Sequence, residues 1–365
     1  MFQALRETGA LFLWNEIMSN IKKAAILGAS GYTGVEVIRL LQHHPKLEIS
    51  ALTGHSRAGE RAGDVFANTA HLGLPDLQDW QEVNWPDIDV AFACLPHGAS
   101  QETIAEILPH VPTVVDLSAD FRLRDPELYS KVYGRPHNFP DILEEAVYGL
   151  SEWARESLRE AKLIACPGCF PTCTLLPLLP LLKDELIETS SLPISAITGV
   201  TGAGRKASLG LTYTELAEGA HAYGVGSHRH APEIDQIIER VTGQKTNVSL
   251  TPHLVPMNRG MITTTVVKLK EPNTYNELRE SLKATYQDSK FITVLPEGDI
   301  PQTRHVRGSN RCHMNVFRDR TAGTAIVIAV IDNLTKGSSG QAIQNYNLSQ
   351  GWEENLGLDI IGFFP

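Results

Sequence analysis

Apolar and polar positions alternate in two different ways along this chain, and the change comes near its middle. In the first half, short apolar stretches alternate with segments whose apolar residues recur at helical spacing. We predict strands over residues 22–27, 47–53, 88–94 and 113–116, and helices over 33–43 and 100–108. Strands that alternate with helices are typical of a parallel, doubly wound sheet, so we predict a Rossmann-like α/β domain over residues 21–166.

The second half carries longer segments rich in Val, Ile and Thr, with fewer helical stretches between them. These segments cover residues 192–201, 247–256, 261–269, 312–317 and 324–331. The pattern is typical of an α+β domain with a largely antiparallel sheet, which we predict for residues 167–332. We expect residues 333–365 to form a C-terminal helix that returns to the first domain.

Residues 1–20 precede the first predicted strand. Their apolar stretch at 10–14 is far shorter than the ~20 residues of a membrane span, and no small-residue cleavage site follows it. We predict an N-terminal extension that is dispensable at least as far as residue 17. A short helix packed on the body of the protein is the alternative.

The composition is that of a globular protein, with 42% hydrophobic and 20% charged residues. The formal net charge of −10 argues against a nucleic-acid or anionic-membrane partner, because both need a basic surface. Five cysteines, an odd number, favour a reducing compartment, and we predict a cytoplasmic protein. No apolar run approaches the length of a membrane span.

A glycine-rich loop follows the first predicted strand and opens the first predicted helix. Its glycines stand at Gly28, Gly31 and Gly34, a G-x-x-G-x-x-G spacing that departs from the strict dinucleotide motif. Glycines let a backbone approach a pyrophosphate, and a helix N-terminus supplies N–H groups for it. We therefore predict a nucleotide site at Gly28, Ser30, Gly31, Tyr32, Thr33 and Gly34. An ordinary glycine turn is the alternative.

The end of the second predicted strand bears on the choice of cofactor. No Asp or Glu stands between residues 53 and 57 to hold a ribose 2′-hydroxyl, whereas Ser56 and Arg57 could hold a 2′-phosphate. This favours NADPH, unless Arg57 is simply a solvated loop residue. A second loop, with Pro96 and Gly98, follows the third predicted strand and is expected along the cofactor.

Cys169 stands where a Pro-Gly turn opens into a predicted helix, and it is the candidate nucleophile. Because a helix N-terminus favours the thiolate, we expect a lowered pKa for this thiol. Pro177 and Pro180 are expected to kink or shorten the helix. The alternatives are a redox pair with Cys166, a metal site with Cys166 and Cys173, or buried structural thiols; we predict no metal.

A histidine pair, His228 and His230, flanks Arg229 just before a further predicted helix start. An imidazole beside a thiol can act as base and later as acid, which makes His228 the candidate partner of Cys169. Arg229 could bind a carboxylate or phosphate through a bidentate pair. Structural histidines or a metal-binding pair are the alternatives.

With these residues in place, the sequence from Lys22 onward resembles N-acetyl-gamma-glutamyl-phosphate reductase, an enzyme family of arginine biosynthesis. The resemblance rests on ordered motifs at residues 28–34, 95–98, 115–122, 167–172, 199–206, 228–234, 256–260 and 331–337. It implies an NADP-linked enzyme whose nucleophile is Cys169 and whose acid/base is His228. Cys166 departs from the residue that is commoner before the Pro-Gly, and it could form an inhibitory disulfide with Cys169.

The resemblance also implies a substrate, further site residues and an assembly. The implied reaction is NADPH-dependent reductive dephosphorylation of N-acetyl-L-glutamyl 5-phosphate to the semialdehyde through a cysteine thioester. Asn333 is assigned to the cofactor, and the expected substrate-binding residues are Arg122, Arg205, Arg229 and His230. The second domain is expected to form a homodimer or homotetramer. A reductase of acetylaminoadipyl or aspartyl phosphate, or a non-catalytic NADP-binding protein, remains the alternative.

Overall fold

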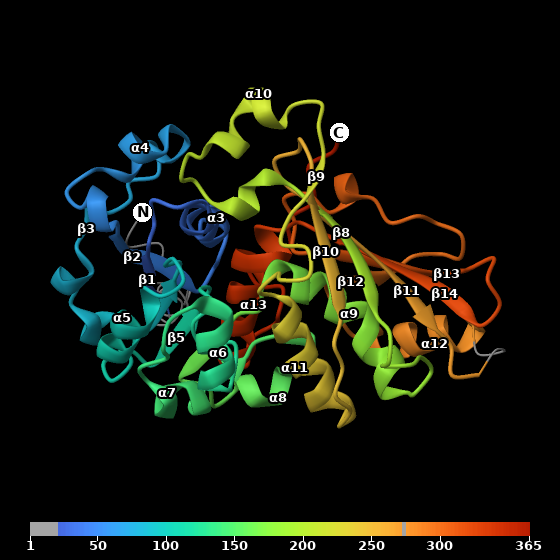
Figure 1. The fold of residues 1–365 in the computed structure, drawn as a ribbon. Coiled ribbons are helices and arrows are strands. Elements are labelled where there is room, and N and C mark those ends of the chain that lie inside the picture. Colours follow the sequence, from blue (N-terminus) through green and yellow to red (C-terminus); the bar gives the residue numbers. More distant parts are fainter. Residues whose placement is uncertain (1–20, 272–274) are drawn as a thin grey trace, which may run out of the picture.

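The computed structural model describes residues 21–271 and 275–365, so the predicted extension at 1–20 lies outside the described residues. Two seven-stranded sheets organise the chain (Figure 1). The first contains β1 (Lys22–Leu27), β2 (Leu47–Thr53), β3 (Leu77–Gln78), β4 (Val90–Ala93), β5 (Thr113–Asp116), β6 (Val147–Tyr148) and β7 (Leu163–Ala165). Their order is β3-β2-β1-β4-β5-β7-β6, and every pairing is parallel.

Helices cover both faces of this parallel sheet, which explains its continuous apolar strands. Alternate residues of β1 belong to opposite layers: Ile26 packs with α3 (Tyr32–Leu41), and Leu27 packs with α5 (Ser100–Ile107). The layer of α3 also receives Ile343 and Tyr346 from α13 (Gly340–Ser349), at the far end of the chain. The smaller helices are α4 (Ala62–Val65), α6 (Pro126–Tyr133), α7 (Pro140–Glu145), α8 (Arg155–Leu158) and α10 (Tyr213–Leu216).

The second sheet is mixed but mostly antiparallel. It contains β8 (Pro193–Thr198), β9 (His221–Ala222), β10 (Ser249–Leu254), β11 (Met261–Lys268), β12 (Ile292–Val294), β13 (Cys312–Arg318) and β14 (Thr324–Ile331). Their order is β12-β13-β14-β11-β8-β10-β9, with parallel pairing only for β8 with β10 and β12 with β13. The predicted fold class, a Rossmann-like domain with a largely antiparallel α+β domain, is confirmed.

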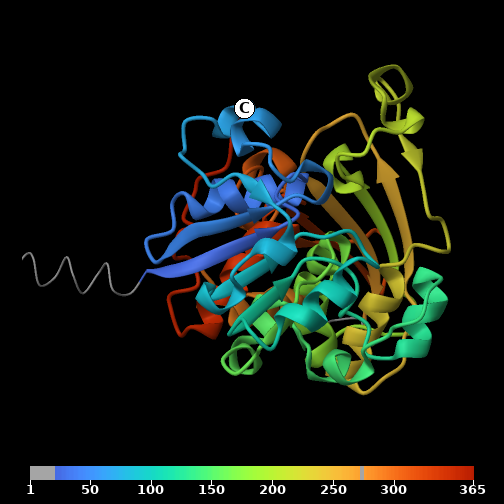
Figure 2. The ribbon, with the colours of Figure 1, turned by 90° about the vertical axis from the view of Figure 1, so that its left-hand side faces the viewer.

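Three helices cover one face of the second sheet: α9 (Cys169–Lys183), α11 (Ala231–Thr242) and α12 (Tyr275–Tyr286). The apolar side chains of Ile197 and Val266 on the other face remain 38% and 40% exposed, which shows that this face is open in the single chain. Figure 2 shows a segment around α10 that projects from the body. Among the helices of the described residues, none is both long and apolar enough to cross a bilayer.

Two details beyond residue 166 differ from the sequence expectations. Pro177 and Pro180 were expected to kink or shorten α9, but they do not end it, since the helix runs on to Lys183 with both prolines inside it and buried. Its apolar residues are buried all round, so tertiary packing compensates for the lost hydrogen bonds. The predicted C-terminal helix is preceded by a π-helical turn, Thr335–Ser339, which the sequence pattern did not indicate.

Candidate active site

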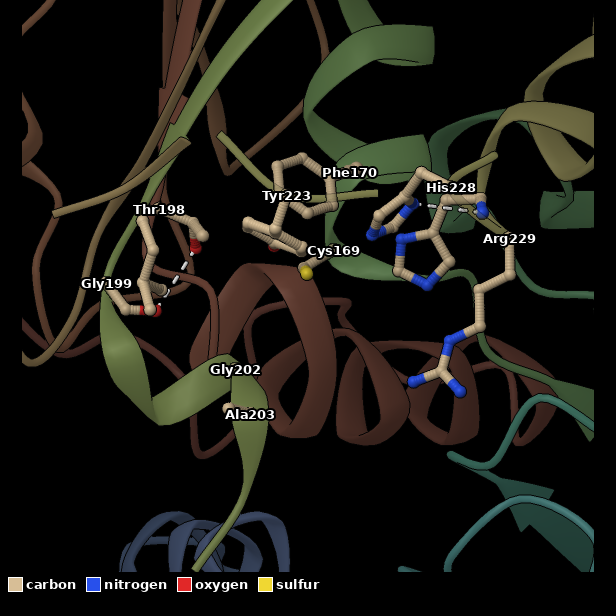
Figure 3. A pocket seen from close by; sticks show the side chains of 11 residues that line it. Cys169, Phe170, Thr198, Gly199, Gly202, Ala203, Tyr223, His228 and Arg229 are labelled. Carbon is tan, nitrogen blue, oxygen red and sulfur yellow. Dashed lines mark hydrogen bonds between the residues drawn. The ribbon is translucent and has the colours of Figure 1, made fainter. Parts of the chain in front are cut away.

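A cavity of about 210 Å³ opens where α9, β8 and the segment before α11 meet (Figure 3). Its lining residues are Cys169, Phe170, Thr198, Gly199, Gly202, Ala203, Tyr223, His228, Arg229, His230 and Leu254. Figure 3 shows Cys169 between the loop that carries Gly199 and the imidazole of His228. The fold therefore brings together the thiol and the histidine pair that the sequence singled out.

Cys169 is the first residue of α9, and Gly168 is the residue that caps the helix. A side chain at Gly168 would not fit, since a Cβ there would lie 2.6 Å from the ring of His230. On the other side, a Cβ at Gly337 would lie 2.8 Å from the Cβ of Cys169. Two glycines thus leave the space in which the thiol and its neighbouring imidazole sit.

The protonation of Cys169 differs from the expectation. Burial raises the pKa of this thiol to about 11, although Arg122 and the N–H of Phe170 act to lower it. The predicted lowering by the helix N-terminus is therefore wrong for this structure, because desolvation of the thiolate outweighs the helix and the arginine. At neutral pH the thiol carries its proton, which has to leave when the sulfur attacks a substrate.

The two imidazoles lie close together, with ring centroids 4.9 Å apart, and both contact Phe170. Burial, with help from Arg229, lowers the pKa of His228 to about 4, so this ring is neutral at pH 7. The backbone N–H of His230 donates to Nδ1 of His228 over 3.2 Å. In the neutral ring this assigns the proton to Nε2, which makes His228 a hydrogen-bond donor.

Arg229 lies at the cavity and is exposed to solvent. Its guanidinium donates to the imidazole of His97 over 3.1 Å and lies 6.0 Å from the ring centre of Tyr133. His97 belongs to the loop after β4, in the first domain. Arg229 therefore bridges the two domains beside the thiol, where its cationic head is available to an anionic group.

Arg122 and Arg205, the other two predicted substrate arginines, both bind backbone carbonyl oxygens in this structure. Arg122 is buried, and it donates to the carbonyl oxygens of Cys166 (2.7 Å) and Leu117 (3.1 Å). Arg205 reaches the nucleotide loop instead, donating to the carbonyl oxygen of Ser30 over 3.1 Å. Arg122 thereby supports the thiol turn, and Arg205 joins the second domain to the first; their assignment to the substrate stays a prediction.

The glycine loop between β1 and α3 has the geometry that a dinucleotide needs. Gly28 has φ of +72°, and a Cβ at Gly34 would lie 2.5 Å from the carbonyl oxygen of Gly28. Gly31 caps α3, whose first turn carries no acidic side chain. The helix N-terminus is thus free to face an anion, so the residues present fit a bound nicotinamide dinucleotide. Ser30, Tyr32 and Thr33 belong to the same loop and first helical turn.

The predicted 2′-phosphate residues lie in a single 3-10 turn, His55–Arg57, at the end of β2. The guanidinium of Arg57 forms an ion pair with Glu60 at 2.8 Å, with about two fifths of each side chain exposed. Pro96 and Gly98 lie in the loop after β4, and Gly98 donates its N–H to the buried carboxylate of Asp120 at 2.7 Å. This bond ties the second loop to the segment that follows β5.

Asn333 makes two hydrogen bonds within the protein, and its assignment to the cofactor stays a prediction. Its side-chain oxygen accepts from the N–H of Gly260 (2.9 Å), and its nitrogen donates to Oγ1 of Thr201 (3.0 Å). The amide is buried, and both of its ends are engaged within the second domain. Its observed contacts support the loop that carries Gly202 and Ala203 into the cavity.

All five cysteines are free thiols. Cys166, Cys173 and Cys312 are buried, while Cys94 and Cys169 are partly exposed. Within residues 21–271 and 275–365, no group of three His, Cys, Asp or Glu side chains is arranged to hold a metal ion.

The sequence reasoning missed two residues that the structure places at the centre. Glu233 accepts a hydrogen bond from the N–H of Gly168 (2.8 Å), and Gly337 packs on Cys169. Both stand inside motifs that were noted for other reasons. An acidic residue such as Glu233 is common in the first turn of a helix, and nothing in the sequence indicated which backbone group it would bind.

The fold and the site together define a semialdehyde dehydrogenase. The family model for the NAD binding domain of semialdehyde dehydrogenases matches residues 23–161, and the model for their dimerisation domain matches residues 169–333. The structure is also similar to that of aspartate semialdehyde dehydrogenase II from Vibrio cholerae, with a TM-score of 0.69 and 16% identity over 90% of this chain and 98% of that one. The NADP-bound enzyme from Candida albicans gives 0.63 and 19%, over 92% and 99%. At these identities the likeness establishes the fold.

Closer relatives narrow the family. The chain is 49% identical over 343 residues to a probable chloroplastic N-acetyl-gamma-glutamyl-phosphate reductase of Oryza sativa, over 94% of this chain and 82% of that protein. It is 48% identical to the N-acetyl-gamma-glutamyl-phosphate reductase of Afipia carboxidovorans, over 94% and 98%, and 47% identical to that of Rhodospirillum rubrum, over 95% and 100%. The chain belongs to the N-acetyl-gamma-glutamyl-phosphate reductase family.

Proposed function

We propose that this protein reduces N-acetyl-L-glutamyl 5-phosphate to N-acetyl-L-glutamate 5-semialdehyde and phosphate, with NADPH as reductant, as a step of arginine biosynthesis. The observation that carries the proposal is the position of Cys169, at the N-terminus of α9 and in one cavity with His228. Relatives of the same name at 47–49% identity support the substrate. The glycine loop supports a dinucleotide, and Ser56 with Arg57 supports the phosphorylated form.

In the first chemical step, Cys169 attacks the acyl carbon of the substrate, forming a carbon–sulfur bond and breaking the bond to phosphate. The thiol proton leaves with the departing phosphate as hydrogen phosphate, so the step balances. The Nε2–H of His228 donates to the carbonyl oxygen as negative charge develops there. The product of this step is a thioester on Cys169.

When bound, NADPH supplies a hydride to a carbonyl carbon. A thioester accepts hydride far more readily than a carboxylate, which is why the enzyme forms one. His228 keeps its hydrogen bond to the oxygen while the sulfur of Cys169 departs as a thiolate, which takes up a proton from solvent. Arg229, exposed at the cavity, binds the phosphate or the α-carboxylate of the substrate.

We also propose how the domains divide the work. Residues 21–166 hold the cofactor, residues 167–332 supply the thiol and the histidines, and residues 333–365 return to the cofactor domain. The packing of α13 against the layer of α3 supports this return. Helix α13 thereby ties the end of the chain to the nucleotide site.

We propose that the chain forms a homo-oligomer, a dimer or a tetramer, through the open face of the second sheet, because that face carries apolar side chains. In the register of the sheet, Ile197 pairs with Ile262 and Val266 pairs with Ile326, and all four point away from the helices. A dimerisation-domain model that covers this region supports a second copy of the chain as the covering surface. A Val266→Asp variant is expected to sediment as a smaller species than the wild type.

The thioester is tested by the variant Cys169→Ala and by phosphate release without reductant. The wild type is expected to release about one phosphate for each active site and to gain an acyl group on Cys169, as measured by mass spectrometry. A Cys169→Ala variant that keeps more than about a hundredth of the wild-type rate excludes obligatory covalent catalysis.

A further inference from the structure

The carboxylate of Glu233 connects two segments that meet at the thiol. It lies in the first turn of α11, just after the histidine pair, and is only 1% exposed. Its Oε1 accepts from the N–H of Gly168 and from the hydroxyl of Tyr148, each over 2.8 Å. Because Gly168 caps α9, this oxygen holds the backbone turn that presents Cys169.

The second oxygen of the same carboxylate faces a buried cation. Oε2 of Glu233 makes no hydrogen bond and lies 3.6 Å from Nη1 of Arg122, whose side chain is 8% exposed. Arg122 is held in turn by the carbonyl oxygens of Cys166 and Leu117. A buried guanidinium without a counter-ion is costly, so Glu233 supplies the charge that compensates Arg122.

Both members of this pair act on the thiol. Burial dominates the pKa of Cys169; Arg122 lowers it, and Glu233 raises it. The other titratable or charged groups around the thiol are Tyr223, Cys173, His228, Arg229 and His230. Glu233 is the carboxylate that acts on this pKa, so its removal takes a negative charge away from the sulfur.

We propose that Glu233 is a positioning residue of this active site: its carboxylate fixes the turn that carries Cys169 and offsets the positive charge of Arg122 beside the sulfur. The proposal rests on Cys169 being the nucleophile of the proposed reaction. It separates two roles that two substitutions can distinguish. A glutamine keeps an oxygen for Gly168 but removes the charge, whereas an alanine removes both.

The test compares Glu233→Gln, Glu233→Ala and, as a matched control on the same helix, the exposed Glu239→Gln. The rate at which iodoacetamide alkylates Cys169 is measured at pH 8 by mass spectrometry of the Cys169 peptide. Loss of the neighbouring negative charge lowers the pKa of Cys169 and so increases its thiolate fraction at pH 8. A thiolate of lower pKa is a weaker nucleophile, but this offsets only part of the gain in alkylation rate. Glu233→Gln is expected to react about threefold faster than the wild type, and Glu239→Gln at the wild-type rate.

The steady-state constants report the positioning role. Glu233→Ala is expected to lose at least about thirtyfold in kcat with an unchanged KM for NADPH, because a misplaced thiol slows chemistry without touching the cofactor loop. Glu233→Gln is expected to stay within about tenfold of the wild-type kcat. If Glu233→Ala does not fold, Glu233→Gln still decides the charge role, and its kcat relative to that of Glu239→Gln shows whether an uncharged oxygen is enough to hold the turn.

An alkylation rate for Glu233→Gln equal to that of the wild type overturns the charge role. A Glu233→Ala enzyme with wild-type kcat overturns the positioning role. Because alkylation needs no substrate, the charge role can be read even in a protein without reductase activity. Failure of the proposed function is therefore distinguishable from failure of this inference.

Discussion

Glu36 offers a sharp test of how the cofactor domain is held to the second domain. This carboxylate lies on α3, just behind the glycine loop, and is 1% exposed. It accepts from both ends of the Arg259 guanidinium at 2.9 and 2.7 Å, from Arg39 at 2.7 Å, and from Oγ1 of Thr335 at 2.8 Å. Arg259 and Thr335 belong to the other half of the chain, so a single carboxylate connects the two.

The contribution of these contacts to the free energy of folding follows from the pKa of Glu36. Burial acts to raise it, but the hydrogen bonds and charges of Arg259 and Arg39 outweigh burial and lower it from 4.5 to about 2. At about 1.4 kcal/mol for each pH unit, this difference corresponds to about 3 kcal/mol of folding free energy. Because the folded pKa lies below the unfolded one, the stabilisation is complete above pH 4.5 and is lost as the pH falls through 2.

The perturbation is Glu36→Gln, which keeps the shape and removes the charge. The free energy of unfolding is measured in urea by two probes whose transitions must coincide, since a chain of this size can unfold in steps. The variant is expected to be less stable by about 3 kcal/mol at pH 7 and by about 1.5 kcal/mol at pH 3. The control is Glu280→Gln, whose partner Lys283 is exposed; it is expected to match the wild type. A loss below about 1 kcal/mol at pH 7, or a loss that does not change with pH, refutes the reasoning.

Four further predictions concern the site itself. Gly337→Ala places a Cβ 2.8 Å from that of Cys169 and is expected to lower kcat at least about tenfold. The control Gly210→Ala, whose Cβ meets open space, is expected to leave kcat unchanged. An equal kcat for the two variants would contradict the role of Gly337 in packing against the thiol. Arg57→Ala is expected to raise KM for NADPH about tenfold and to leave KM for NADH unchanged. An equal rise in both KM values would contradict the assignment of Arg57 to the 2′-phosphate. His228→Asn is expected to lower kcat by about a hundredfold or more with the fold intact in circular dichroism, and a near-normal kcat would exclude its donor role. The rate of alkylation of wild-type Cys169 is expected to keep rising as the pH approaches about 11, because the fraction of reactive thiolate grows until the pH reaches the raised pKa. A rate that levels off near pH 8 would contradict the raised pKa.

Local chemistry explains which parts of the fold the sequence could predict. The glycine loop was predictable because positive φ at Gly28 and the close approach at Gly34 demand glycine. Strands with six to eight residues of periodic pattern, such as β11, were also visible. By contrast, β3 and β6 have two residues each, which is too short for any periodicity, and long-range pairing alone defines them.

The same distinction between local and long-range features applies to the residues of the site. Cys169 and His228 were recognisable from residue type and from the helix starts beside them. The partners of Arg122 and Arg205 were not, because a guanidinium binds whichever carbonyl oxygens the fold brings to it. The pKa of the thiol was predicted in the wrong direction for a related reason: the helix N-terminus is a local feature, whereas the burial that outweighs it is set by the whole fold.

The reverse reaction tests the central claim most directly. The protein is mixed with N-acetyl-L-glutamate 5-semialdehyde, phosphate and NADP⁺, and NADPH is followed by its absorbance, with aspartate semialdehyde and acetylaminoadipate semialdehyde assayed in parallel. The account predicts NADPH formation that requires phosphate, prefers the first aldehyde and disappears in Cys169→Ala. NADPH formation only with another aldehyde would contradict the substrate, and its absence with all three would contradict the proposed activity.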